Sequence, residues 1–201
     1  MEKTSETLIM VFTRDMIAGR VKTRIGRVLG DAVALDVHQR LCLHTRRIVE
    51  EVAADKWVWM DQHPIGAWLW GDGVFRCMVQ QGSDLGERMA HAFQVAFQAG
   101  YRRVLIIGTD CPGLTADLLK DSISRLGDDP AVIGPAADGG YYLLGLTVHI
   151  PELFTGKAWS TDRVLASTIA DLEDRGFRYS SLPVLTDVDT PDDLIHLQGI
   201  P

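Results

Sequence analysis

The chain has 201 residues, of which 46% are hydrophobic and 23% are charged, and its formal net charge is -7. This length and composition are typical of one globular domain, so we expect residues 1–201 to form a single domain with a buried core. The acidic balance excludes a general nucleic-acid binder, because polyanions bind basic surfaces, and no apolar run reaches the roughly 20 residues that span a bilayer.

The beginning of the chain, residues 1–7, is polar and lacks the basic-then-apolar pattern of a signal peptide. The three cysteines show no zinc-binding spacing, and Cys42 and Cys77 fall in patterns that are typical of a protein core. Buried free cysteines favour a reducing compartment, so we expect a cytoplasmic protein.

Strands and helices alternate in the first half of the predicted structure. The continuous apolar run 8–12 is typical of a strand buried on both faces of a parallel sheet. A helical pattern extends from Asp31, which can cap it, to about Asp55. Further strands are predicted at 56–60 and 75–79, and a further helix at 85–98. Residues 63–73 fit neither pattern and carry no prediction.

The second half continues this alternation and adds one reversal. Strands are predicted at 104–108 and 131–135, with a helix between them from Thr115 to about Leu126. Asp138-Gly139-Gly140 is typical of a tight turn, so the apolar run 141–146 should form an antiparallel strand. The remaining predicted elements are a helix at 162–175, a strand ending near Val188 and a short helix from Pro191. This order favours a mostly parallel sheet covered by helices on both faces.

A basic loop follows the first predicted strand, at the edge where open parallel sheets bind their ligands. It runs from Thr13 and Arg14 through Gly19 to Lys22 and Arg24. Backbone amides near glycine, together with lysine and arginine, can bind phosphate oxygens. The loop has neither the P-loop spacing nor the dinucleotide-binding spacing. The alternative is a solvated basic loop without a ligand.

Two acidic positions follow later strands. Asp110 comes after the run 104–108, and Asp189 lies in an acidic segment near the C-terminus. Mg²⁺ binds one or two carboxylates together with phosphate and water oxygens, so we expect Asp110 and Asp189 to converge on one cation. The alternatives are a turn before Pro112 for Asp110 and a helix cap for Asp189 or Thr190. Period-two spacing puts Asp187 on the same side as Asp189 if this segment is extended, and its contact with the cation stays open.

Two further groups lie at predicted strand ends. Asp138, Gly139, Gly140 and Tyr141 can let a substrate approach the backbone closely, or they can serve only as a hairpin turn. Asp84 can cap the helix 85–98, and Arg88 can reach a phosphate or pair with Asp84. Cys111 has no partnering base nearby, and the six histidines show no ligand spacing.

Taken together, these motifs resemble a known family in their order and spacing. The matching segments are 12–14, 19–24, 81–89, 108–112, 134–135, 138–142 and 187–190. They resemble the bacterial glycosyltransferase-A-like radical-SAM/selenodomain-associated transferases, type 1, of the nucleotide-diphospho-sugar transferase superfamily. The resemblance implies a three-layer α/β/α Rossmann-like fold with a mixed sheet, a nucleotide near the N-terminal loop and Mg²⁺ or Mn²⁺ near Asp110.

Two branches of this superfamily resemble the motifs of this chain to different degrees. Its sugar-transferring members often hold their metal with Asp-x-Asp, which Asp110-Cys111-Pro112 is not. Its nucleotidyltransferases often have Asp-x-Pro at that strand end and a late Asp before Thr-Pro, which is similar to Asp110 and Pro112 here and to Asp189-Thr190-Pro191. Their N-terminal loop is usually richer in glycine than this one.

The leading hypothesis is a divalent-cation-dependent transferase that binds a nucleoside triphosphate or nucleotide sugar and moves the nucleotidyl group to a small acceptor, phosphorylated or not. Lys22 and Asp110 are the expected catalytic residues, and Asp110 and Asp189 the expected metal ligands. The expected nucleotide or substrate contacts are Thr13, Arg14, Lys22, Arg24, Asp84, Arg88, Asp138, Gly139, Gly140 and Tyr141. The alternatives are a glycosyltransferase that uses a nucleotide sugar, and a non-catalytic nucleotide-binding or regulatory module.

Overall fold

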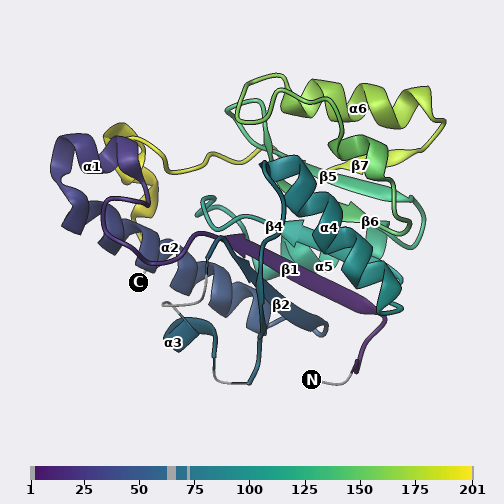
Figure 1. Cartoon of the computed structure of the whole chain (residues 1–201), viewed down its shortest axis with the longest axis horizontal. Helices are drawn as coiled ribbons and strands as arrows, with labels where there is room; N and C mark the ends of the chain where they lie inside the picture. Colours follow the sequence, from purple (N-terminus) through teal and green to yellow (C-terminus); the bar gives the residue numbers. More distant parts are fainter. Residues whose placement is uncertain (1–2, 63–66, 72, 201) are drawn as a thin grey trace.

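The computed structural model describes residues 3–62, 67–71 and 73–200, and in these residues the chain builds a seven-stranded sheet (Figure 1). The strand order is β3-β2-β1-β4-β6-β5-β7. The strands are β1 Thr7–Thr13, β2 Asp55–Met60, β3 Arg76–Val79, β4 Arg103–Ile107, β5 Ala131–Pro135, β6 Tyr141–Leu146 and β7 Tyr179–Ser181. Among these strands only β6 runs antiparallel, and it does so to both β4 and β5. The predicted mixed sheet with one antiparallel strand is confirmed.

Helices cover both faces of the sheet and complete three layers. On one face lie α2 (Asp31–Glu50), α3 (Ala67–Trp70) and α5 (Ala116–Arg125), and on the other lie α4 (Leu85–Gln98), the 3-10 helix η1 (Pro151–Phe154) and α6 (Val164–Asp174). Strand β1 is buried throughout, with Ile9 and Val11 packed in the first core and Leu8, Met10 and Phe12 in the second. Burial on both faces explains its uninterrupted apolar sequence.

A third, smaller core lies at the end of the molecule beside the sheet. Helix α1 (Thr23–Leu29) packs against the start of α2 and the C-terminal 3-10 helix η2 (Pro191–Leu197). Ile25, Val37, Val188 and Leu197 are buried between them. Figure 1 shows α1 and the C-terminal segment side by side. This cluster brings residues 22–24 next to residues 188–190.

Several predicted boundaries need correction. Gly30, not Asp31, is the N-cap of α2, and the helix ends at Glu50 rather than near Asp55. Helix α6 begins at Val164 rather than at Asp162. Helix α1 replaces part of the predicted basic loop.

The predicted end of the last strand near Val188 is wrong, because β7 ends at Ser181. Pro183 has no backbone N–H to donate, and beyond it a single bridge between Ala136 and Leu185 continues the pairing. The backbone N–H of Val188 instead donates to the backbone carbonyl oxygen of Asp110 at 2.9 Å. Two predicted caps are confirmed, since Asp84 accepts from Glu87 N and Thr115 from Leu118 N.

The segment without a prediction, 63–73, is only partly described. Residues 63–66 and 72 lie outside the described residues, and 67–70 form α3, whose Leu69 and Trp70 are buried. No helix in the described ranges is long and apolar enough to cross a membrane.

Candidate functional site

Three segments that are distant in sequence meet at the carboxyl end of β4. They are the loop after β1, the residues Gly108 to Asp110 that follow β4, and the segment 187–190. The backbone N–H of Val188 donates to the carbonyl oxygen of Asp110, which fixes the C-terminal segment beside the strand end. This edge of the sheet is where open α/β sheets bind ligands.

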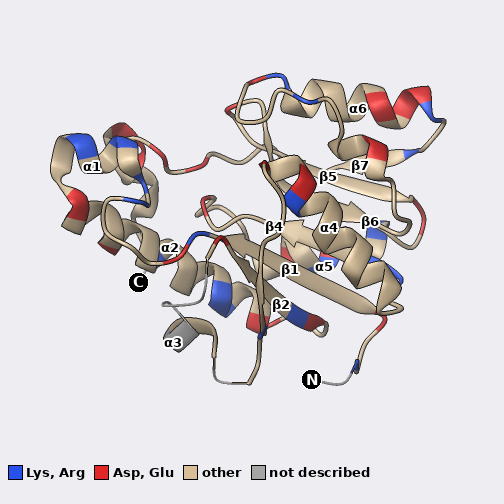
Figure 2. Cartoon of the chain, viewed as in Figure 1, with Lys and Arg blue, Asp and Glu red and all other residues tan. Residues whose placement is uncertain are grey.

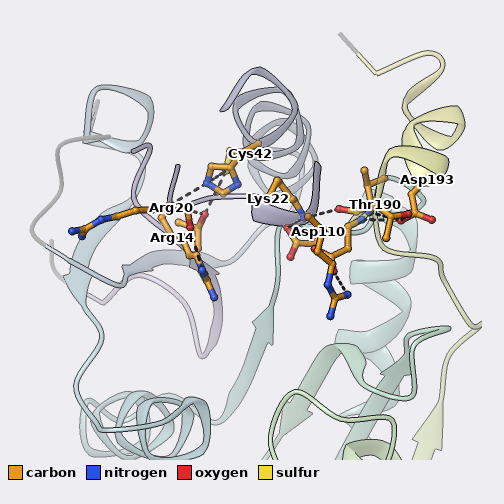
Figure 3. A network of polar contacts seen from close by, with 12 residues as sticks. Arg14, Arg20, Lys22, Cys42, Asp110, Thr190 and Asp193 are labelled. Atoms are coloured by element: carbon orange, nitrogen blue, oxygen red, sulfur yellow. Dashed lines mark hydrogen bonds and ion pairs between the residues drawn. The ribbon is translucent and has the colours of Figure 1, made fainter. Parts of the chain in front are cut away.

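Lys22 is the residue through which the three segments are joined. Its ammonium lies 2.6 Å from Oδ1 of Asp110 and donates to the carbonyl oxygen of Val188 at 2.7 Å. The Lys22 side chain is 4% exposed, whereas that of Asp110 is 53% exposed. Figure 3 shows the two side chains pointing toward each other. A buried ammonium needs such partners, because leaving it unpaired is strongly unfavourable.

The backbone at Lys22 is left-handed, with φ 44° and ψ 47°, at the N-cap of α1. This conformation costs a non-glycine residue on the order of 1 kcal/mol. The surrounding contacts therefore hold Lys22 in a strained turn, and the turn directs its side chain toward Asp110.

A second ion pair joins the same two ends of the chain. Nη1 of Arg24 lies 2.5 Å from Oδ2 of Asp189, and both side chains are exposed. The carboxylate of Asp193 accepts hydrogen bonds from the backbone N–H groups of Asp189 and Thr190 and from the Thr190 hydroxyl. These bonds hold Asp189 on a fixed turn at the start of η2.

Asp187 adds a third acidic side chain to this region. Burial raises its pKa, and the negative charges of Asp138 and Asp110 raise it further, while Lys22 opposes them. Asp138 is exposed, and its Oδ1 accepts the backbone N–H of Gly140 at 2.8 Å. The carboxylates of Asp187, Asp138 and Asp110 come from three separate segments and repel one another here. A cation bound between them would reduce this repulsion.

The basic loop rests on a buried pair from α2 that the sequence analysis missed. Nε2 of His38 lies 3.2 Å from the carbonyl oxygen of Arg14 and 3.6 Å from Sγ of Cys42. Burial lowers the pKa of His38, and burial raises the pKa of Cys42 to about 12. Both are therefore neutral near pH 7 and support the loop. Their spacing of four residues on the buried face of α2 was the signal available in the sequence.

The other expected residues of the loop have local contacts. Thr13 is buried, with its hydroxyl 3.4 Å from Sγ of Cys42, so its side chain lies in the core beneath the loop. Arg14 is exposed and donates from Nη1 to the carbonyl oxygen of Arg20 at 3.1 Å. Cys111 stays a neutral thiol near pH 7, because burial and the charge of Asp187 raise its pKa to about 12.

Asp84 and Arg88 lie at the start of α4. Asp84 caps the helix, and Nε of Arg88 donates to the carbonyl oxygen of Gly82 at 3.1 Å rather than to Asp84. Within the described residues no direct contact joins either side chain to Lys22 or Asp110. Both side chains thus hold the loop after β3 in place, and their contact with a nucleotide or substrate stays a prediction.

The turn after β5 forms a tightly packed part of the site. Gly139 has φ 87°, and a Cβ added there would overlap the backbone of Asp162. Its carbonyl oxygen accepts the N–H of Leu165 at 2.9 Å. The Tyr141 hydroxyl lies 3.8 Å from Sδ of Met89. The turn is thus docked on the segment that leads into α6.

That segment is also packed against α4. A Cβ added at Gly86 would overlap the indole nitrogen of Trp159 and would lie 2.6 Å from the carbonyl oxygen of Phe154. Trp159 and Tyr141 both pack on the core beneath α4 while remaining partly exposed. The Gly139 turn and residues 155–163, here called the packed wall, are therefore held by close contacts of glycine, and one buried ion pair, of Lys157 with Asp171, ties the segment to α6.

The donor set fits a cation that a ligand helps to hold. In the described part of the chain no three or more His, Cys, Asp or Glu side chains gather as a complete metal site. The nearby donors are carboxylates, which are the ligands that Mg²⁺ and Mn²⁺ prefer. Mg²⁺ usually takes one or two carboxylates and completes its shell with phosphate and water.

Charges of both signs surround this region. Figure 2 shows basic and acidic positions close together along the ribbon of α1 and the C-terminal segment. The expected basic loop is therefore balanced by the acidic C-terminal segment in space. This arrangement suits a ligand that carries both a cation and phosphates better than a polymer of phosphates.

Comparison with known proteins identifies relatives of the chain. A family model described as "Uncharacterized protein conserved in bacteria (DUF2064)" matches residues 44–161. A crystal structure from Desulfovibrio desulfuricans G20, provisionally described as a nucleotide-diphospho-sugar transferase, is 33% identical with a TM-score of 0.88, over 93% of this chain and 84% of that chain. No match is found among proteins of curated function.

More distant structures share the fold. CMP:2-keto-3-deoxy-manno-octonic acid synthetase complexed with CTP is 13% identical with a TM-score of 0.61, over 96% of this chain and 97% of that chain. Rv0371C from Mycobacterium tuberculosis H37Rv, complexed with manganese, is 13% identical with a TM-score of 0.59, over 96% and 98%. The family resemblance inferred from the motifs is confirmed.

Proposed function

Because this chain belongs to the DUF2064 family, with a nucleotide-diphospho-sugar transferase as a relative, we propose that it is a divalent-cation-dependent nucleotidyltransferase. It would transfer the nucleotidyl group of a nucleoside triphosphate to a small acceptor. The observation that carries the proposal is the contact of Lys22 with Asp110 beside Val188, because it brings a phosphate-binding ammonium and a cation-binding carboxylate to one strand end.

The proposed reaction joins an acceptor oxygen to the α-phosphorus and releases pyrophosphate. Lys22 and Arg24 would hold the phosphate oxygens, and their charge would stabilise the negative charge that grows on the leaving group. Asp110, together with Asp189 or Asp187, would hold the cation. The cation would polarise the phosphoryl oxygens and neutralise part of their charge.

The packed wall would bind the acceptor. Asp138, Gly139, Gly140 and Tyr141 lie at the end of β5 and the start of β6, and β6 pairs directly with β4. A rigid surface favours transfer because it holds the acceptor oxygen in line with the phosphorus. Where Asp189 is the second cation ligand, Asp187 is left free, and its raised pKa makes it a suitable group to accept a proton from an acceptor hydroxyl.

Two observations support nucleotidyl transfer as the first candidate. A fold neighbour holds CTP and another holds manganese, which are the two ligand classes proposed for this chain. Asp110-Cys111-Pro112 also lacks the Asp-x-Asp pattern of many sugar-transferring enzymes. Glycosyl transfer remains the second candidate, because the relative of 33% identity carries a nucleotide-diphospho-sugar transferase description.

A thermal-shift screen tests the proposal. The wild-type chain is heated with each of the four common nucleoside triphosphates, with their diphosphates and with nucleotide sugars, in the presence of Mg²⁺ or EDTA. We expect a triphosphate to raise the Tm only with Mg²⁺. A ligand that is present at about 100 times its Kd adds about 2.7 kcal/mol to the stability, which a melting curve resolves easily.

Two variants separate the outcomes of this screen. Asp110→Asn should abolish the Mg²⁺-dependent shift, whereas Asp117→Asn, at an exposed acid that pairs with Lys120, should keep it. A shift with nucleotide sugars alone would favour glycosyl transfer. A triphosphate that binds but never yields pyrophosphate with any acceptor would favour the non-catalytic module, and no shift at all would contradict the proposal.

A further inference from the structure

The groups expected to bind phosphate and the groups expected to bind the cation are paired with each other in this structure. Lys22 contacts Asp110, and Arg24 contacts Asp189. Each basic side chain is therefore already paired with a carboxylate. A ligand that is only a cation, or only an anion, must compete with one of these ion pairs for its partner.

We propose that the substrate is the preformed complex of the divalent cation with the nucleotide, which enters by exchanging these two ion pairs. Phosphate oxygens take Lys22 and Arg24, and the cation takes Asp110 and Asp189. This inference rests on the proposed function and specifies its substrate class. A free cation and a metal-free nucleotide are each predicted to bind poorly.

The burial of Lys22 makes it unfavourable for a free cation to bind Asp110. A cation on Asp110 would sit against an ammonium that is 4% exposed, and the lysine would keep only the carbonyl oxygen of Val188 as its partner. Two positive charges would then compete for one carboxylate, and the ammonium, unlike the half-exposed carboxylate, has little water to solvate it. The Lys22 side chain therefore acts as a competitor for the cation on Asp110.

The carboxylates make it unfavourable for a metal-free nucleotide to place a phosphate on Lys22. A phosphate on Lys22 would lie against Asp110, and Asp187 and Asp138 add negative charge nearby. The negative phosphate and these carboxylates would repel each other unless a cation lies between them. With both parts of the ligand present, every broken ion pair is replaced by a new one.

Two features of the local geometry favour this exchange, the spare donor of Lys22 and the open space beside Asp110. Lys22 uses two of its three N–H donors, and its flexible stem lets the ammonium pivot while the turn stays in place. Space is also available beside Asp110, whose carboxylate is 53% exposed. Gly108, two residues before it, is exposed, and a Cβ added there would meet no atom within 4 Å.

Binding measurements on the wild-type chain test the inference directly. The free Mn²⁺ signal in electron paramagnetic resonance gives the affinity for Mn²⁺ alone, and calorimetry in EDTA gives the affinity for each nucleoside triphosphate alone. Calorimetry with the preformed Mn²⁺–triphosphate complex gives the third affinity. We expect each part alone to bind at least about 10-fold more weakly than in the presence of the other, which lies in the usual 5–150-fold range of coupled sites.

A lysine variant then identifies the cause of the coupling. Lys22→Met keeps the length of the side chain and removes its charge, so we expect Mn²⁺ alone to bind at least about 5-fold more tightly. The complex should bind more weakly, because a phosphate contact is lost. Lys120→Met, which removes an exposed lysine paired with Asp117, is the matched control and should change neither affinity.

The outcomes distinguish this inference from the proposed function. If Mn²⁺ and nucleotide bind the wild-type chain independently, or if Lys22→Met leaves the Mn²⁺ affinity unchanged or lowers it, the inference is wrong while nucleotidyl transfer still stands. If no nucleotide binds in any form, with or without Mn²⁺, the proposed function and the inference are both wrong, even where Lys22→Met strengthens Mn²⁺ binding.

Discussion

The two sides of the candidate site are held together by different kinds of contact. The side formed by the loop after β1 and the C-terminal segment is joined by the ion pairs of Lys22 with Asp110 and of Arg24 with Asp189. On the packed wall, the close contacts at Gly139 and Gly86 leave no room for a side chain, and the buried ion pair of Lys157 with Asp171 ties the wall to α6. A charged ligand can replace an ion pair, but no ligand can replace a close backbone contact. The first side is therefore adjustable, and the second is a fixed surface.

The largest expected effect is a loss of stability on the packed wall. In Gly139→Ala the new Cβ would overlap Asp162, and φ is 87°, so we expect the free energy of unfolding to fall by about 2–4 kcal/mol. Urea denaturation measures this change. Gly156→Ala is the control, since Gly156 has φ 68° and open space around it, and it should cost only about 1 kcal/mol. Equal losses would show that close packing is not the cause.

A smaller loss is expected at Gly86, on the other contact of the wall. Alanine usually stabilises a helix by about 1 kcal/mol over glycine, but here its Cβ would displace the indole of Trp159. We expect Gly86→Ala to lower stability by about 1–2 kcal/mol. Trp159→Ala and the double variant complete a cycle, in which alanine at position 86 should become neutral or stabilising once the indole is absent. If the stability changes of the two single variants simply add in the double variant, the contact between position 86 and the indole is contradicted.

A weaker, pH-dependent effect is expected at Asp187. Its folded-state pKa is raised by burial and by Asp138, so its ionised form destabilises the fold above that pKa, and the penalty disappears as the pH falls toward and below its ordinary value of 3.8. Asp187→Asn should therefore be more stable than the wild type at pH 7, with a difference that shrinks toward pH 4. Urea denaturation across this range measures it.

Asp193 supplies a control of opposite sign on the same segment. Burial alone would raise its pKa, but hydrogen bonds from Thr190 and Asp189 bring it below the ordinary value. Its ionised form thus stabilises the fold above its unfolded pKa, and this contribution is lost as the pH falls through the lowered folded value. Asp193→Asn should be less stable than the wild type at pH 7. Stability changes of the same sign in the two variants would contradict these assignments.

The smallest effect on stability is expected on the ion-paired side. The side chains of Arg24 and Asp189 are 68% and 38% exposed, and exposed pairs contribute about 0–1 kcal/mol. Arg24→Ala should change the free energy of unfolding by less than about 0.5 kcal/mol, while it weakens binding of the cation–nucleotide complex. Paired urea and calorimetry measurements check both statements. A large stability loss would remove the distinction between the two sides.

The features that could be predicted from sequence are the ones encoded locally. The strand at 8–12, the caps Asp84 and Thr115 and the reversal at Asp138 each depend on residues within one turn or one strand. Burial on both faces of β1 leaves an apolar run, and a tight turn leaves its glycines, so both are visible without any tertiary contact.

The features that could not be predicted depend on distant partners. Helix α1 contains a single buried residue, Ile25, and has no acidic residue in its first turn, so its sequence reads as a basic loop. Its partners in the third core lie in η2 and at Val188. The contact of Lys22 with Asp110 and the support of Arg14 by His38 likewise depend on folding, because no periodicity links these positions. The role of Asp189 as a metal ligand stays a prediction.

The hydrogen bond from Lys22 to the carbonyl oxygen of Val188 joins residues 166 positions apart. Ribosomes add about 5–20 residues per second, so roughly 8–33 seconds pass between the synthesis of the two partners. During this interval the lysine has no carbonyl acceptor, and the third core lacks its C-terminal half. The nascent polypeptide therefore remains without an assembled site until Val188 and the residues of η2 have left the ribosome, however early the sheet begins to form.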